Sequence, residues 1–175
     1  MEKTMENKIF KVGDKIINFN KVYRIFKIIK QKGEDKKEKI ISFRPYFRTK
    51  DKRSLTFSIP VTSIDKTNIR KPMSKKELKQ LLSELSKTSN IKTPIDIIKT
   101  REQLSLNDPD IHVQILKCLW KEKNDGTTNF TKIKSDVLGL AIEFLTEEVA
   151  LVSGVSLKKA EKKIKTALKR SKQYC

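Results

Sequence analysis

The sequence predicts an α+β protein of two domains, a small antiparallel β-barrel or strongly bent sheet at residues 8–72 and an all-α bundle of four to five helices at residues 92–172. Three observations predict it. Short apolar alternations separated by turn residues fill residues 10–69, as in half-buried strands. The apolar residues then recur at helical spacing, beginning with a connecting helix at 74–87. A chain of 175 residues, 37% of them hydrophobic, can bury two small cores.

The first part of the chain contains four alternating segments and a fifth, shorter one. The predicted strands are Lys15 to Asn18, Val22 to Lys30, Lys39 to Phe47 and Leu55 to Pro60, with a short one near Asn68 to Arg70. Successive side chains of a strand face opposite sides, so the alternation gives each strand one buried face. The charged stretches QKGEDKKE and RTKDKRS lie between strands and are predicted hairpin loops.

The change of period comes at Ser74. Ser74 and Glu77 have the spacing of a capping box, and the leucines that follow lie on one face of a helix that ends near Lys87. After a linker, Pro94 opens a short predicted helix that runs through Leu104.

Three more helices are predicted beyond this linker. The first starts at Asp108 and Pro109 and stops at Asp125-Gly126. The second is long, is capped by Thr128 or Asn129, and ends at Ser153-Gly154. The third runs from about Ser156 to Arg170, with a lysine-rich face opposite its apolar face.

The charge of the chain is strongly positive. Forty Lys and Arg residues against 21 Asp and Glu residues give a formal net charge of +19, which favours binding to polyanions, above all nucleic acid. Residues 1–87 carry 24 basic and 10 acidic side chains, and residues 88–175 carry 16 and 11. The alternative is that the lysines reflect an AT-rich genome and only solvate the surface.

Several classes of protein are not indicated. No apolar run approaches the roughly 18 to 20 residues that span a bilayer, and we expect a cytoplasmic, nucleoid-associated protein without a signal peptide. Cys118 and Cys175 are far apart and indicate neither a disulfide framework nor a zinc site. His112 is the only histidine and has no partner at motif spacing, so we expect no catalytic residues, no metal and no cofactor.

Four segments together resemble the CarD and CdnL family of bacterial transcription regulators. Phe10–Ile17 resembles the opening strand of that family, which is shared with the polymerase-binding domain of transcription-repair coupling factors. Leu55–Pro60, followed by Arg70 and a leucine-rich helix, resembles the family's strand, spacer and helix. Ile115–Lys121 is similar to its basic segment with a Leu-Trp pair, and Phe144–Leu151 to its later I-L-x-x-E-L-A-L segment.

The chain departs from the family at three places. Asn18–Arg24 lacks the two glycines that usually follow the first strand. Asn68 stands where the family commonly has Gly, a mild exchange because Asn tolerates a left-handed backbone. Ser58 stands where the family has an arginine that contacts the polymerase β subunit.

The resemblance implies a monomeric transcription regulator that binds the RNA polymerase β subunit through a Tudor-like domain at 8–72. Its helical domain at 92–172 would bind promoter DNA and modulate the stability of the open complex. The basic hairpin would dock on polymerase, and the candidate residues there are Lys32, Arg48, Lys50, Arg53 and the position of Ser58. The alternative for this hairpin is a solvated basic tip.

In the helical domain the resemblance assigns DNA contact to Trp120. Such a tryptophan would act as a wedge at the edge of the transcription bubble, with Lys117, Lys121 and Lys123 holding phosphates. The alternative is that Trp120 fills the core. The lysines of 158–172 are interpreted as a solvated face with a secondary role on duplex DNA. The rival function is a free-standing nucleic-acid-binding protein that acts without polymerase.

Overall fold

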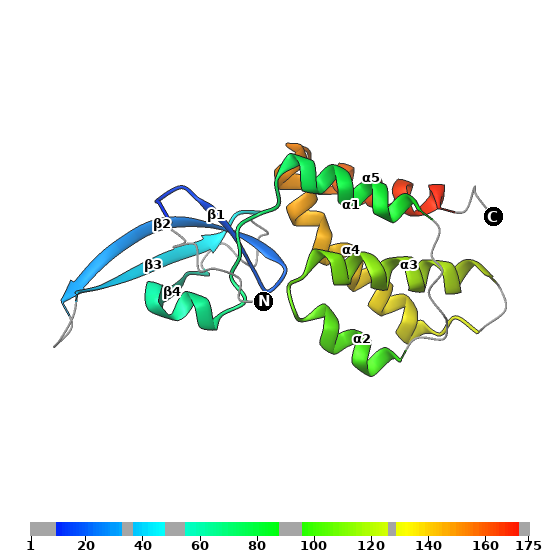
Figure 1. The fold of residues 1–175 in the computed structure, drawn as a ribbon, viewed down its shortest axis with the longest axis horizontal. Coiled ribbons are helices and arrows are strands. Elements are labelled where there is room, and N and C mark those ends of the chain that lie inside the picture. Colours follow the sequence, from blue (N-terminus) through cyan, green and yellow to red (C-terminus); the bar gives the residue numbers. More distant parts are fainter. Residues whose placement is uncertain (1–9, 33–36, 48–54, 88–95, 126–128, 172–175) are drawn as a thin grey trace, which may run out of the picture.

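The fold of the chain is an antiparallel sheet beside a bundle of helices, which confirms the α+β class (Figure 1). We describe it from a computed structural model, in which residues 10–32, 37–47, 55–87, 96–125 and 129–171 are placed well enough for description. The sheet occupies one end of the elongated molecule and the helices occupy the other (Figure 1). No helix in these ranges is long and apolar enough to cross a membrane.

The sheet has four strands in the order β1-β2-β3-β4, each antiparallel to its neighbour. They are β1 (Lys15–Asn18), β2 (Lys21–Lys32), β3 (Lys37–Pro45) and β4 (Phe57–Pro60). All four predicted strands exist, and the first has the predicted bounds. At their shared hairpin, β2 ends two residues later than predicted and β3 begins two residues earlier. Residues 33–36 of this hairpin and the predicted loop at 48–54 lie outside the described ranges.

The described strands form an open sheet and do not close into the predicted barrel. After β4 the chain forms a 3-10 helix, η2 (Val61–Lys66), below the sheet in Figure 1, and returns to the far side of β1. There the predicted fifth strand is reduced to one antiparallel bridge, in which Arg70 exchanges two backbone hydrogen bonds of 2.8 and 3.1 Å with Ile17. Pro72, two residues later, has no N–H with which to continue a ladder.

Five α-helices follow. They are α1 (Lys75–Ser86), α2 (Ile97–Leu104), α3 (Pro109–Asp125), α4 (Lys132–Ser153) and α5 (Leu157–Arg170). The helix predicted to connect two domains, α1, instead packs within the bundle, because its buried leucines join the same hydrophobic cluster as α3, α4 and α5.

The ends of the helices show which of the predicted capping residues are used. Ser74 and Glu77 form the predicted capping box, and Gly154 ends α4 in the left-handed conformation with φ of 64°. Two of the other N-termini differ from prediction. Asp96 caps α2, and Thr131, rather than Thr128 or Asn129, caps α4. Each of these residues accepts a backbone N–H of the first turn of its helix, which is the role of an N-cap.

Two hydrophobic clusters stabilise the two halves. In the sheet, Ile16, Ile25, Ile41 and Phe43 are fully buried. The ring of Phe43 lies 5.4 Å from that of Tyr23, and η2 covers the cluster with Ile64. The second cluster lies among the helices and includes Leu85, Leu116, Leu119, Leu145, Ile164 and Leu168, none of them more than 1% exposed. Each half therefore has a core of its own.

The turn between β1 and β2 has an unusual residue. Phe19 and Asn20 both have positive φ, 47° and 59°, as a tight two-residue hairpin requires. Asn suits this conformation, but Phe does not, since its Cβ crowds the backbone there. The Phe19 side chain is also 72% exposed, so it recovers little free energy by burial.

We predict that Phe19→Gly stabilises the protein by about 0.5 to 1 kcal/mol, because glycine relieves the left-handed strain and only part of that gain is offset by its greater chain entropy. Phe19→Ala is the matched control, since it removes the ring but keeps the Cβ. Urea unfolding of the two variants checks the prediction. Equal stability of the Gly and Ala variants would contradict it.

Candidate nucleic-acid interface

The most basic element among the described residues is α5. Its sequence, LKKAEKKIKTALKR, has seven basic residues and one acidic residue in 14 positions. The side chain of Ser156 caps its first turn, and four residues, Ala160, Ile164, Ala167 and Leu168, are buried against the bundle. The basic residues occupy the rest of the circumference and are all exposed.

The seven basic residues of α5 form two rows along the helix. Lys158, Lys162, Lys165 and Lys169 follow one another at spacings of four, three and four residues and share one face, which extends along about 16 Å of helix. Lys159, Lys163 and Arg170 lie about 100° further round the helix and form a second row. We call these seven residues the α5 basic face.

Little of this charge is neutralised within the described chain. Lys165 forms an ion pair of 2.5 Å with Glu161, in which both side chains are nearly half exposed. The helix α1 packs beside α5 (Figure 1) and adds the exposed residues Lys75, Lys76 and Lys79 near its own N-terminus. The α5 basic face therefore lies in a surface region where phosphates would meet several cations at once.

The residues predicted to bind DNA lie on α3, where the charge is balanced. Three basic residues, Lys117, Lys121 and Lys123, are accompanied by Asp110, Glu122 and Asp125. The ammonium group of Lys117 is held 3.1 Å from Glu84 of α1, and this side chain is only 9% exposed. Lys121 is half-buried, whereas Lys123 is exposed, with its ammonium 6.0 Å from the ring centroid of Phe130.

Trp120 is half-buried and packs against the cluster of the bundle. Its indole N–H is buried and has no hydrogen-bond partner among the described residues. Only part of the ring is thus accessible from solvent, at the end of α3 where Lys123 is also exposed.

The predicted polymerase contacts fall mostly outside what the structure describes. Arg48, Lys50 and Arg53 lie in residues 48–54, and Lys32 is described only in its backbone, at the end of β2. Ser58 is described and is exposed on β4, with its hydroxyl 2.8 Å from that of Ser42 on β3. Because β4 is an edge strand, Ser58 lies at the rim of the sheet.

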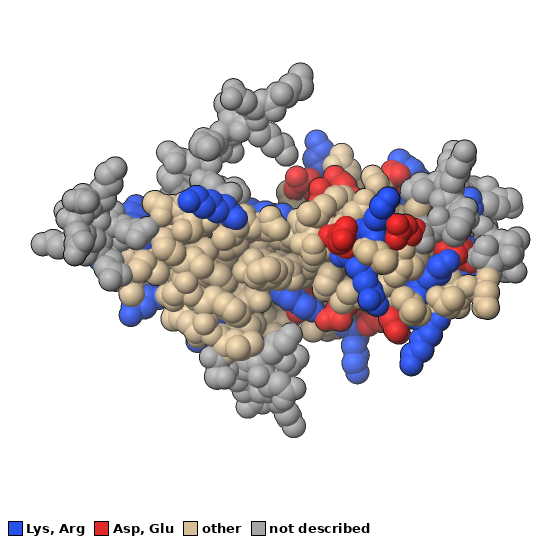
Figure 2. Space-filling model, turned by 90° about the horizontal axis from the view of Figure 1, so that it is seen from below, with Lys and Arg blue, Asp and Glu red and all other residues tan. Residues whose placement is uncertain are grey.

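The surface around this rim is uncharged. Residues 55–64 read LTFSIPVTSI, ten positions without a charge in a chain with 35% charged residues. Leu55 and Phe57 are 43% and 38% exposed there. Figure 2, which views the molecule from below, shows a broad uncharged face on the sheet half and mixed basic and acidic side chains on the helical half. The β4 edge, defined as residues 55–60, therefore suits a protein partner better than a polyanion.

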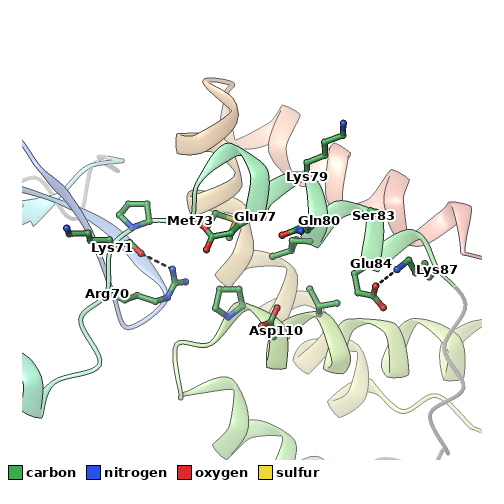
Figure 3. Close-up of a pocket in the computed structure, with 14 residues that line it drawn as sticks. Arg70, Lys71, Met73, Glu77, Lys79, Gln80, Ser83, Glu84, Lys87 and Asp110 are labelled. Atoms are coloured by element: carbon green, nitrogen blue, oxygen red, sulfur yellow. Dashed lines mark hydrogen bonds and ion pairs between the residues drawn. The ribbon is translucent and has the colours of Figure 1, made fainter. Parts of the chain in front are cut away.

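A groove with a volume of about 1090 Å³ lies between α1 and the start of α3. Two of its charged side chains have partners in the chain (Figure 3): Glu84 pairs with Lys87 at 2.8 Å, and Arg70 donates a hydrogen bond to the carbonyl of Lys71. The first turn of α1 likewise holds Glu77 by hydrogen bonds with Ser74, which lower the pKa of that carboxyl. Basic and acidic side chains therefore both line the groove.

The sheet and the bundle meet at a buried carboxylate. Glu148 of α4 is 2% exposed and accepts hydrogen bonds from both terminal nitrogens of Arg70, at 2.7 and 2.6 Å. It also accepts the backbone N–H of Met73 at 2.7 Å. The Nε of Arg70 donates to the carbonyl of Asn107 at 2.9 Å, and the side chain of Asn107 donates to Asn68.

The adjacent residue makes a second contact with the sheet. Glu147 accepts the backbone N–H of Val22 at 2.8 Å, and Lys21 forms an ion pair of 2.5 Å with Glu143. Neighbouring side chains on a helix point about 100° apart, so Glu147 and Glu148 reach different parts of the sheet. The sequence does not predict the pairing of Arg70 with Glu148, because the two residues are 78 positions apart.

The described residues contain no group of three or more His, Cys, Asp or Glu side chains that could hold a metal ion. His112 is 1% exposed, and its Nε2 lies 3.1 Å from the carbonyl oxygen of Leu104, to which a neutral ring donates. Burial lowers the pKa of His112 below its usual value of 6.5, with a smaller contribution from Arg70 in the same direction. The ring is a packed component of the helix bundle.

Comparison with known proteins adds no family assignment. No family model matches the chain, and no curated protein matches it significantly.

We predict that the free energy of unfolding falls as the pH is lowered from 7 to 5 and that His112→Gln removes this dependence. The lowered pKa keeps His112 neutral in the folded state, while the unfolded chain takes up a proton below about pH 6.5. His112 is the only histidine, so a change of stability between pH 7 and 5 that His112→Gln abolishes comes from this ring. Urea unfolding at pH 7, 6 and 5 measures it, and a variant with the wild-type pH dependence would refute the assignment.

Proposed function

We propose that the chain is a transcription regulator that binds duplex promoter DNA through its helical half and the RNA polymerase β subunit through its sheet half. In this role it binds and does not catalyse. The observation that carries the proposal is the α5 basic face, with seven basic residues and one acidic residue in 14 positions. The sequence segments that resemble the CarD and CdnL family support the polymerase part.

The chemistry of the α5 basic face suits phosphates rather than base edges. Six of its seven cations are lysines, which act as point charges, and the polar residue between them is Thr166. Base readout relies instead on Arg, Asn and Gln side chains that make bidentate hydrogen bonds. We therefore propose sequence-independent binding to the duplex backbone, driven by release of counterions.

The β4 edge supports contact with a protein. It has an unpaired side, because β4 is the last strand of the described sheet, and residues 55–64 are uncharged and include the exposed Leu55 and Phe57. An edge strand of this kind accepts a strand or loop of a partner, which satisfies its free backbone groups. The predicted basic hairpin, which contains Arg48, Lys50 and Arg53, follows β3 and precedes β4, so it is adjacent in sequence to this edge.

The sheet half also supports the proposed likeness to Tudor and SH3-like barrels. The order of β4, η2 and a return to β1 is the path by which such barrels bring a fifth strand beside the first. Here the Ile17–Arg70 bridge is the only described part of that pairing. We propose that residues 8–72 and 92–172 are two domains of this open-barrel and bundle type.

Binding at both surfaces would shift the equilibrium between the closed and the open promoter complex. A factor held on polymerase stabilises the open complex only if it binds the DNA of that state more tightly than the DNA of the closed state. Trp120 and Lys123, exposed in part at the end of α3, are the proposed second contact with that DNA. The rival function, a free nucleic-acid-binding protein, requires the α5 basic face but not the β4 edge.

For DNA binding, we predict that Lys158→Gln combined with Lys162→Gln weakens duplex binding and lowers the slope of log K against log salt by about 1.8. Each lysine that neutralises one phosphate contributes about 0.9 to that slope. Fluorescence anisotropy with duplexes of two unrelated sequences, from 50 to 300 mM salt, measures affinity and slope together.

The control is Lys66→Gln combined with Lys99→Gln, two exposed lysines on η2 and α2 that remove the same net charge. We expect this control to keep the wild-type slope. An equal loss in both double variants would show that general charge, rather than the α5 basic face, determines binding.

For polymerase binding, we predict that Leu55→Glu combined with Thr56→Glu reduces affinity for bacterial RNA polymerase at least about tenfold, which is about 1.4 kcal/mol. Both side chains are exposed, so the substitutions leave no cavity, but a docked partner would bury the new charges. The measurement is a pull-down of purified polymerase after nuclease treatment.

The matched control is Gln103→Glu combined with Gln114→Glu, which adds two charges on the exposed faces of α2 and α3. It should leave polymerase recovery unchanged. If wild-type protein recovers no polymerase once nucleic acid is removed but still binds DNA, the free nucleic-acid-binding protein is the correct function.

A further inference from the structure

The contact between Arg70 and Glu148 holds the sheet and the helix bundle together and also restricts their relative orientation. Two parallel hydrogen bonds of 2.7 and 2.6 Å join the planar guanidinium to the carboxylate, and such a fork restricts both distance and angle. The Nε of the same guanidinium donates to Asn107 at 2.9 Å, so its plane is fixed at a third point.

The backbone of both partners is fixed as well. Arg70 is bridged to Ile17 of β1, so its position belongs to the sheet. Glu148 lies five residues before the end of α4 and also accepts the N–H of Met73, which precedes α1. The ion pair therefore joins β1, the segment before α1, the α2–α3 turn and α4 at one buried place.

A second set of contacts on the same helix prevents rotation about this point. Glu147 holds the N–H of Val22 at 2.8 Å, and Glu143 holds Lys21. The side chain of Asn20 also donates to the carbonyl of Leu104 at 2.9 Å. Two separated attachments between rigid bodies define their relative orientation, whereas one would allow a swivel.

These contacts lie between the two surfaces of the proposed function. The β4 edge is three strands away from β1 within the sheet, and α5 follows α4 directly and packs along it. Displacement of α4 against β1 would therefore move the α5 basic face relative to the β4 edge.

We propose that Arg70 and Glu148 are positioning residues that set the separation and angle between the polymerase-binding edge and the DNA-binding face. This inference rests on the proposed function. Once the β4 edge is docked, α5 is presented to the DNA at one fixed place, and the second binding event becomes intramolecular. Linkage of this kind raises affinity by about 10² to 10⁴ when the geometry fits, and the gain is lost when it does not.

The experiment compares DNA affinity with and without saturating RNA polymerase, for the full chain and for Glu148→Gln. The exchange replaces one carboxylate oxygen with an amide NH₂ that opposes the guanidinium donors, so the fork is lost while the shape is kept. We expect binary affinities for DNA alone and for polymerase alone to stay within about twofold of wild type. The gain produced by polymerase should fall at least about tenfold.

Two further variants separate positioning from simple destabilisation. Arg70→Lys keeps the charge but not the fork, and it should lose part of the gain while folding at a temperature close to wild type. Glu84→Gln breaks an ion pair between α1 and α3 within the bundle and should keep the whole gain. All binding is measured at a temperature at which circular dichroism shows each variant to be folded.

A folded Glu148→Gln or Arg70→Lys variant with the full polymerase-dependent gain would overturn the inference, as would an equal loss of gain in Glu84→Gln. If wild-type protein binds each partner but shows no gain, the inference fails and the proposed function stands. If wild-type protein binds neither partner, the proposed function fails first.

Discussion

The arrangement of the molecule depends on one buried ion pair between residues 78 positions apart. Removing two charges from water costs several kcal/mol per ion, and the loss is offset only where every polar atom finds a partner. Glu148 meets this condition with three donors, two from Arg70 and one from Met73. An apolar contact would hold the two halves together as firmly, but it would not specify their angle. The fork of two hydrogen bonds restricts that angle, together with the contacts of Glu147 and Glu143 with the sheet.

Local signals in the sequence were sufficient for most of the secondary structure. Capping residues such as Ser74, Ser156 and Gly154 bond to backbone groups within four positions of themselves. Their effect can therefore be predicted from the local sequence. The cap of α4 was misplaced because Asn129 and Thr131 are similarly good caps by residue type, and Thr131 is the one that accepts the N–H of Lys134. The predicted fifth strand is reduced to a bridge because Pro72, two residues after Arg70, has no N–H with which to continue a ladder.

The sequence predicted the candidate interface only in part, because it does not show which basic residues form ion pairs within the protein. On α3 the sequence shows Lys117, Lys121 and Lys123 around Trp120, but an ion pair to Glu84 on another helix removes Lys117 from the surface. No pattern within α3 predicts that loss. On α5, seven basic residues accompany one acidic residue, which is more positive charge than ion pairs within this helix can neutralise. A helix with this excess of basic residues therefore keeps most of its charge at the surface, as α5 does.

The proposed function requires that a chain of net charge +19 bind a protein selectively. A field of that size attracts every polyanion, so a docking surface rich in basic residues would also bind DNA. The β4 edge differs from the α5 basic face in this respect, because residues 55–64 carry no charge while the α5 basic face carries seven basic residues. The contrast holds for these two segments and not for the two halves, because residues 1–87 carry 24 basic and 10 acidic side chains. The contacts of Glu147 and Glu148 with the sheet hold α4, and α5 after it, in place relative to that uncharged segment.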